Sequence, residues 1–172
     1  MNKTLVITVL ATDRPGIVHT LSETLRKHNA NWVDSRMSNL ADKFAGLVQV
    51  SVPTDQLDAL KEKLQALHNS DNHLHIMMEE ANPDDTSDER ELSLELIGAD
   101  RPGIIDDITG ALAKLGVNIN ELETEQREAS MSSEILFYAS MTLGLTPAIS
   151  NDNVQDALEA LQDQLMVDIN FS

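Results

Sequence analysis

The sequence predicts an α+β protein made of two similar domains, each with the element order βαββαβ. The segment Val9–Val18 returns as Leu96–Ile105 at an offset of 87 residues. Around it, the stretches 3–33 and 90–120 share 9 identities in 31 aligned positions. In both copies, strand-like alternation of apolar residues gives way twice to helical spacing. A period of this length is typical of a duplicated small domain and not of a solenoid.

Residue patterns in the first copy predict each element of the order βαββαβ. Leu5, Ile7 and Val9 alternate as in a strand with one better-buried face, and the turn 13–16 ends that strand. The remaining elements are a helix that ends at 29–31, strands at 32–38 and 47–52, a helix opened by Pro53 that carries one leucine stripe, and a strand around 74–78.

The second copy repeats this order, and the two copies are joined by a polar segment. We expect a first domain at residues 1–80, an acidic linker at 81–91 and a second domain at 92–172. The second copy is 7 residues longer between its Asn118 and Pro147 than the first is between Asn31 and Pro53. We expect the extra residues in a hairpin near 126–133, either as drift or as a loop that covers a pocket.

With right-handed crossovers, βαββαβ gives a four-stranded antiparallel sheet with two helices on one face, which is the ferredoxin-like arrangement. Outward-facing residues of the first strands include Val6, Thr8, Ser93 and Glu95, so much of the opposite face is expected to be solvated. Joining the two sheets side by side is the expected way to cover their edges.

The net charge of −17 is divided unevenly. Residues 1–82 contain 8 Lys and Arg against 10 Asp and Glu, whereas residues 83–172 contain 4 against 19. Such a surface repels phosphate backbones, so direct binding of nucleic acid is not expected. The acidic second half could meet a basic protein surface, or it could serve only solubility.

The composition also restricts compartment and chemistry. The chain has no cysteine, no signal-like N-terminal segment and no long apolar run, so we expect a cytoplasmic protein without a membrane span. No catalytic motif, cofactor motif or metal site is expected. His68, His73 and His75 lie close together, but a solvated turn is the preferred interpretation over a zinc site. Trp32 and most methionines are expected to serve packing.

The turn Asp-Arg-Pro-Gly before each first helix is the candidate binding feature. Proline suits the start of a helix, aspartate can accept hydrogen bonds from its free N–H groups, and glycine allows close approach. Such N–H groups can bind a carboxylate. The alternative is that the turn is only a helix cap. Its presence in both copies, as Asp13–Ile17 and Asp100–Ile104, favours a binding role.

Strand, Asp-Arg-Pro-Gly-Ile, amphipathic helix and then Ala30-Asn31 or Gly116-Val117-Asn118-Ile119 together resemble the ACT domain, an amino-acid-sensing module. The resemblance covers both halves. Two such units without a catalytic domain are similar to the glycine cleavage system transcriptional repressor family of bacteria. That resemblance implies a repressor that senses an amino acid such as glycine and acts by binding a LysR-type transcriptional activator, with a homo-oligomer as a further possibility.

The resemblance also implies which residues bind the ligand between paired domains. They are those of the turn and the Asn that begins the second strand: Asp13, Arg14, Pro15, Gly16, Ile17 and Asn31 in the first copy, and Asp100, Arg101, Pro102, Gly103, Ile104 and Asn118 in the second. One departure is the aspartate, since some ACT domains that bind amino acids have a neutral Asn there. Its carboxylate would repel a ligand carboxylate and attract an ammonium group.

Two other functions remain open. The chain could be a structural pairing module that forms oligomers and senses nothing. It could also be part of an enzyme, because formyltetrahydrofolate deformylases begin with a similar strand and turn, although no catalytic domain follows here.

Overall fold

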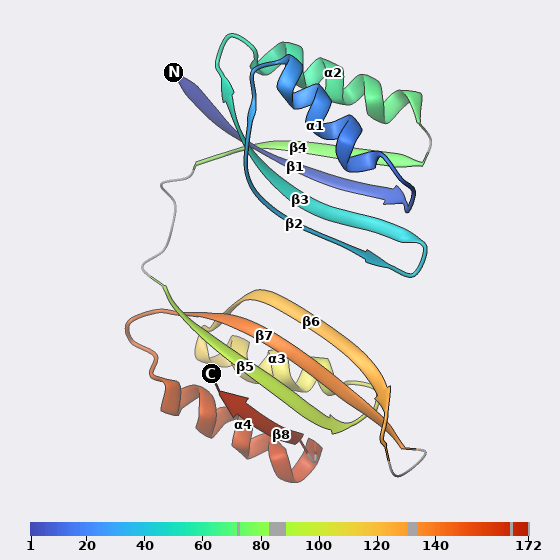
Figure 1. Cartoon of the computed structure of the whole chain (residues 1–172). Coiled ribbons are helices and arrows are strands. Elements are labelled where there is room, and N and C mark those ends of the chain that lie inside the picture. The colour runs from blue at the N-terminus through green and yellow to red at the C-terminus, as the bar shows by residue number, and fades with distance from the viewer. Residues whose placement is uncertain (72, 83–88, 131–133, 166, 172) are drawn as a thin grey trace. The chain divides into compact units, whose positions relative to one another are not determined.

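The computed structural model describes residues 1–71, 73–82, 89–130, 134–165 and 167–171. The chain divides into two compact units, Met1–Asp85 and Thr86–Ser172, and Figure 1 shows both. The first unit contains β1 (Asn2–Thr12), α1 (Ile17–Lys27), β2 (Asn31–Leu40), β3 (Lys43–Pro53), α2 (Leu57–Ser70) and β4 (Leu74–Ala81). The second contains β5 (Arg90–Ala99), α3 (Ile104–Leu115), β6 (Asn118–Glu128), β7 (Ile135–Leu145), α4 (Asn151–Leu165) and β8 (Val167–Phe171).

Each unit is a four-stranded antiparallel sheet with two helices on one face. The strand orders are β2-β3-β1-β4 and β6-β7-β5-β8, so the first strand of each copy lies in the middle of its sheet. Both crossovers place a helix over the same face, and Figure 1 shows α1 and α2 together on one side of the first sheet. The α+β fold with two βαββαβ units is therefore confirmed.

Each unit has its own hydrophobic core between sheet and helices. In the first, alternate residues of β1 such as Leu5 and Ile7 pack with Leu25, Leu60 and Leu64, all 0–1% exposed. In the second, residues equivalent to these form a separate core with α3 and α4. Trp32 is half-buried against the first core, which agrees with its expected packing role.

The connections show where the copies differ in length. β2 and β3 are joined by residues 41–42, whereas β6 and β7 are joined by residues 129–134. The expected insertion near 126–133 therefore begins later, because residues 126–128 continue β6 in pairing with β7. Residues 131–133 lie outside the described residues, as does most of the expected linker at 81–91.

The faces opposite the helices are unlike each other. On the first sheet, Leu10, Leu47 and Met77 are 43%, 50% and 63% exposed, so this face is more apolar than its first strand alone predicted. Thr8 pairs with both Leu47 and Met77, which places these side chains in one row across the sheet. The corresponding face of the second sheet carries several glutamates. Within the described part of the chain, none of the helices is both long and apolar enough to cross a lipid bilayer.

Candidate functional site

A left-handed glycine stands at the start of the first helix of each unit. Gly16 has φ +96° and Gly103 has φ +87°, and each is the N-cap residue of its helix. These are angles that L side chains rarely adopt. Proline precedes the cap residue in both turns, and so lies outside the helix instead of in its first turn as the sequence suggested. Glycine, and not proline, therefore determines how the chain enters the helix.

The first N–H groups of α1 are left without a side-chain cap. The first hydrogen bond of the helix runs from the Thr20 N–H to the Gly16 carbonyl, at 2.9 Å. No side chain of the described residues caps either α1 or α3. The N–H groups of the first turn have no intrahelical acceptor, and the helix dipole adds partial positive charge there. This end of the helix can accept an anionic group.

Both aspartates of the turns are tied to the neighbouring hairpin. Asp13 Oδ2 accepts a hydrogen bond from Asn39 Nδ2 of β2 at 3.1 Å, and Asp100 Oδ2 accepts one from Gln126 Nε2 of β6 at 2.7 Å. The expected capping of the helix by these carboxylates is therefore wrong. The side-chain amide of Asn39 or Gln126 binds the carboxylate instead, and the carboxylate remains beside the helix end as a negative group.

Asn39 and Gln126 were missed by the sequence analysis although a signal for them exists. The two residues are separated by the same 87 positions as the two turns, and each bond spans 26 residues. An amide side chain in both copies at one aligned position was the available signal. The hydrogen bond itself could be predicted only once the hairpin was known to lie beside the turn, because its two residues are 26 positions apart.

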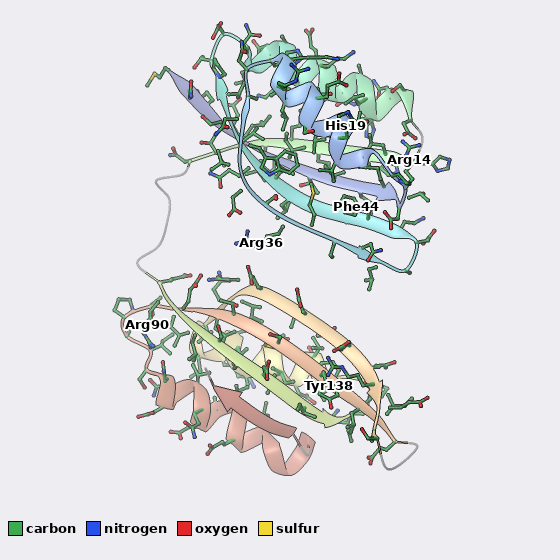
Figure 2. The ribbon with its side chains drawn as sticks, in the orientation of Figure 1. Arg14, His19, Arg36, Phe44, Arg90 and Tyr138 are labelled. Atoms are coloured by element: carbon green, nitrogen blue, oxygen red, sulfur yellow. The ribbon has the colours of Figure 1, made fainter. Side chains whose placement is uncertain are left out.

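The two arginines of the turns take different partners. Arg14 forms an ion pair with Asp71, next to the start of β4. The pKa of the Asp71 carboxyl is lowered, first because it accepts the His73 backbone N–H and also because Arg14 is beside it. Figure 2 shows Arg14 and His19 near the N-terminal end of α1.

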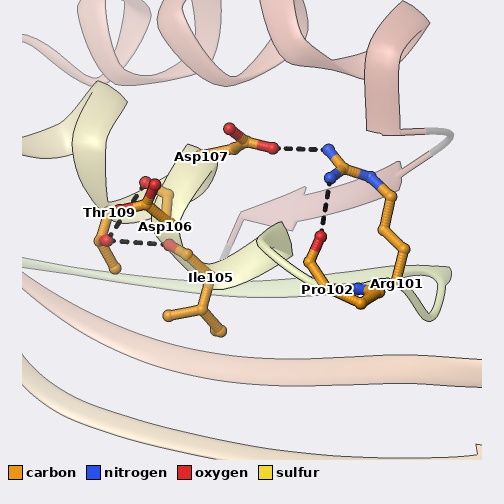
Figure 3. A network of polar contacts seen from close by, with 6 residues as sticks. All are labelled: Arg101, Pro102, Ile105, Asp106, Asp107 and Thr109. Carbon is orange, nitrogen blue, oxygen red and sulfur yellow. Dashed lines mark hydrogen bonds and ion pairs between the residues drawn. The ribbon is translucent and has the colours of Figure 1, made fainter.

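In the second unit, Arg101 contacts α3, the helix that follows its turn. Its Nη2 lies 2.5 Å from Asp107 Oδ2, and its Nη1 donates to the Pro102 carbonyl at 3.2 Å (Figure 3). The position of Asp107 is occupied by Thr20 in the first copy, which offers no carboxylate to Arg14. The two turns therefore share a backbone conformation but have different charged neighbours.

Two depressions flank the first turn. One, of about 290 Å³, is lined by Arg14, Gly16 and Ile17 together with residues near the junction of α2 and β4. The other, of about 150 Å³, lies between Asp13, His19 and Phe44. A small molecule at the helix end would therefore have space on either side of the glycine.

The two asparagines lie far from the turns of their own units. Asn31 begins β2, which follows the C-terminal end of α1, whereas the turn precedes the N-terminal end. The 11 residues of α1 separate them by about 16 Å, since a helix rises about 1.5 Å per residue. Asn118 is related to its turn in the same way, and its Nδ2 donates to Asn120 Oδ1 at 2.9 Å. One unit does not bring its turn and its asparagine together.

The histidines give no sign of a metal centre. His68 Nδ1 accepts the Ile76 backbone N–H at 3.1 Å, and its ring packs edge-on against His75. No group of three or more His, Cys, Asp or Glu residues within the described part of the chain could hold a metal ion.

Comparisons with known proteins agree with the duplicated fold. Residues 3–79 and 92–165 each match a model of the ACT domain. The glycine cleavage system transcriptional repressor of Escherichia coli is 26% identical over 166 residues, which cover 94% of this chain and 85% of that protein. A UPF0237 protein of Methanopyrus kandleri is 44% identical over 62 residues, or 35% of this chain and 69% of that protein.

A solved structure extends the likeness over the whole chain. The crystal structure of a protein of unknown function from Galdieria sulphuraria has a TM-score of 0.84 and 30% identity, and the match covers 100% of this chain and 98% of that one. Together, the two family matches account for both units from the first strand to the last helix. The chain therefore belongs to the ACT domain family and contains two copies of this domain.

Proposed function

We propose that this protein senses a small amino acid, glycine being the first candidate, and represses glycine cleavage genes through a protein partner without contacting DNA. The observation that carries the proposal is the pair of left-handed glycines, each at an uncapped helix start beside an aspartate. The chain is distantly related to the repressor of Escherichia coli. A LysR-type transcriptional activator is the proposed partner.

The turn offers complementary groups to the two ends of an amino acid. The N–H groups of the first helical turn suit the ligand carboxylate. The carboxylate of Asp13 or Asp100 suits the ligand ammonium, and each aspartate is held by its hairpin amide instead of neutralising the helix end. The same aspartate that would repel a simple anion therefore favours a zwitterion.

Asn31 and Asn118 are proposed to contact the ligand from a different module. Because each lies at the far end of its own helix, a ligand that contacts both a turn and an asparagine requires pairing between modules. Pairing between the two copies of one chain, or between two chains, would provide it.

The charge of the chain supports an indirect route to transcription. Residues 83–172 contain 19 acidic against 4 basic residues, which disfavours contact with phosphate backbones. A protein partner avoids this repulsion. Ligand binding would then act as a regulator only if it changes the affinity for that partner, and the coupling is reciprocal.

Calorimetric titration of the full chain with each of the twenty amino acids tests the sensing step. We expect saturable heat with glycine or another small amino acid, and its loss in the double variant Gly16→Val, Gly103→Val. An added Cβ at Gly16 would meet no protein atom within 4 Å, so backbone strain and occupation of the ligand space, not crowding by the protein, would cause the loss. Heat that persists unchanged in the double variant would refute the proposed site.

The control is Gly110→Val inside α3. An added Cβ at Gly110 meets no protein atom within 4 Å, and Gly110 lies away from both the turn and Asn118. We expect ligand heat to survive in this variant. Capture of a LysR-type regulator from a lysate, weakened by added glycine, tests the repression step separately.

A pairing module without a ligand is the second candidate, and the exposed Leu10, Leu47 and Met77 on one sheet face favour it. Sedimentation equilibrium distinguishes the two functions when combined with the titration. Stable oligomers together with no heat for any amino acid would support pairing alone.

A further inference from the structure

The face of the second sheet that lies away from its helices carries several glutamates and one tyrosine. Leu94 and Leu96 of β5 point into the core, so Glu95 and Ile97 between and after them lie on the face away from the helices. Ser140 of β7 pairs with both Glu95 and Glu123, and Tyr138 pairs with both Ile97 and Glu125. We call the outward side chains of Glu95, Ile97, Glu123, Glu125, Arg127, Tyr138 and Ser140 the acidic face.

The acidic face is hollowed. A depression of about 500 Å³ lies over the three strands, with the half-buried Ile97 and Tyr138 at its floor and the exposed Ser140, Glu95, Glu123 and Glu125 around them. Ile97 and Tyr138 are half-buried, whereas the three glutamates are exposed. An apolar and aromatic floor with charged groups around it is typical of a recognition site, and the volume is within the usual range for ligand pockets.

One cation of the chain already occupies part of this depression. The guanidinium carbon of Arg127 lies 4.2 Å from the centre of the Tyr138 ring, and Arg127 also forms an ion pair with Glu125. Figure 2 labels Tyr138 on the second unit. This arrangement of ring and carboxylate is the one that recognises a guanidinium or ammonium group. No ion pair of Glu95 or Glu123 occurs within the described part of the chain, so their charges are available for a second cation.

The first copy serves as an internal comparison. At the positions of Glu95 and Ser140, the first copy has Thr8 and Leu47, which pair across the sheet in the same way. At the positions of Ile97 and Tyr138, it has Leu10 and Ala45. The fold of the domain therefore requires neither the glutamates nor the tyrosine at these positions. They are specific to the second copy, which also carries most of the negative charge of the chain.

We propose that the acidic face binds a basic segment of a partner protein, with a Lys or Arg side chain held between Glu95 and Glu123 beside the Tyr138 ring. Charge complementarity selects this occupant, because the glutamates repel nucleic acid and no metal-binding group of three ligands exists among the described residues. The inference rests on the proposed function in one respect: it locates the surface through which that function would reach its protein partner.

Fluorescence anisotropy of the full chain tests the proposal with a fluorescein-labelled peptide of three Arg-Lys-Gly repeats, in about 0.1 M salt. We expect the double variant Glu95→Gln, Glu123→Gln to bind the peptide about 2- to 30-fold more weakly, the range that two exposed ion pairs provide. We expect Tyr138→Leu to bind it about 2- to 5-fold more weakly, because Arg127 would no longer be held over the ring and would compete with the peptide for the glutamates.

The matched control is Asp156→Asn, Glu159→Gln on α4, which removes the same two charges from exposed positions on the helix-covered side of the sheet. We expect less than a two-fold change in this variant. Equal weakening in both double variants would overturn the proposal, because it would reduce the effect to net charge. Spermidine that competes as well as an unlabelled peptide would overturn the choice of a protein segment.

Amide shifts in the spectrum of the nitrogen-15-labelled, unmodified chain give an answer even if a variant misfolds. Peptide-induced shifts at Glu95, Tyr138 and Ser140 would support the acidic face, and shifts confined to other elements would contradict it. The amino-acid titration separates this inference from the sensing function. Peptide binding without any amino-acid heat would keep the acidic face and refute the sensor, and the reverse result would refute the acidic face alone.

Discussion

Replacement of Gly103 by alanine tests the left-handed start of α3 quantitatively. At φ +87°, an L residue costs about 1–2 kcal/mol relative to glycine. The lower entropy of alanine in the unfolded chain returns about 0.4–1 kcal/mol. Arg101 Nη1, at 3.7 Å from the added Cβ, is in ordinary contact, so no clash is added. We therefore expect a net loss of about 1 kcal/mol of unfolding free energy.

Two other glycines of the second unit provide controls in the same assay. Gly116→Ala at φ +74° should cost about as much as Gly103→Ala, because the strain is similar and the added Cβ has open space. Gly110→Ala inside α3 should instead stabilise the unit by about 1 kcal/mol, since its Cβ also meets nothing and alanine favours helix. Scanning calorimetry should show shifts of about 4–8 °C per kcal/mol in a domain of this size.

The three variants also separate strain from binding. Gly103→Ala and Gly116→Ala should lose similar stability, which tests the strain. Gly103→Ala should also weaken the heat of amino-acid binding because its Cβ enters the helix start, whereas Gly110→Ala should leave that heat unchanged because it lies away from both the turn and Asn118. If Gly103→Ala were as stable as the unmodified chain, the left-handed turn would be incorrect. Equal loss of ligand heat in Gly103→Ala and Gly110→Ala would show that α3 as a whole, and not the turn, controls binding.

Two further predictions concern the first unit. The pKa of the Asp71 carboxyl is lowered in the folded state. Its ion pair with Arg14 should therefore be complete above the ordinary aspartate pKa and be lost as the pH falls through the lowered value. Carbon-13 titration of the Asp71 carboxyl checks this, and the variant Arg14→Gln should move the titration midpoint upward. Leu60→Ala should lower the unfolding free energy by about 2–5 kcal/mol in urea titration, because Leu60 is 0% exposed; a loss below 1 kcal/mol would contradict its place in the core.

Much of the fold could be predicted because it depends on short-range pattern. The alternation around Leu5 and the leucine stripe near Leu60 identify strands and helices by periodicity alone. The repeat of the turn then gave the domain duplication. The open face of the first sheet was predicted less well, because its apolar character comes from Leu47 and Met77 on β3 and β4, while the prediction considered only the first strand.

The candidate site was predicted only in its backbone. The turn residues were identified, but the partner of each aspartate was not, because side-chain hydrogen bonds depend on which hairpin lies next to the turn. The ion-pair partners of the two arginines could not be predicted from the sequence either. Arg14 and Arg101 occupy the same aligned position, yet one contacts Asp71 and the other Asp107, whose aligned position in the first copy is Thr20.

The hydrogen bond between Asp100 and Gln126 would couple the proposed ligand site to the acidic face. Gln126 follows Glu125 and precedes Arg127 on β6, and those two neighbours project onto the opposite side of the sheet. An ammonium group bound to Asp100 would compete with the Gln126 side-chain amide for this carboxylate. Ligand binding beside the turn would then be coupled, through Gln126, to the positions of Glu125 and Arg127 on the opposite side of the sheet.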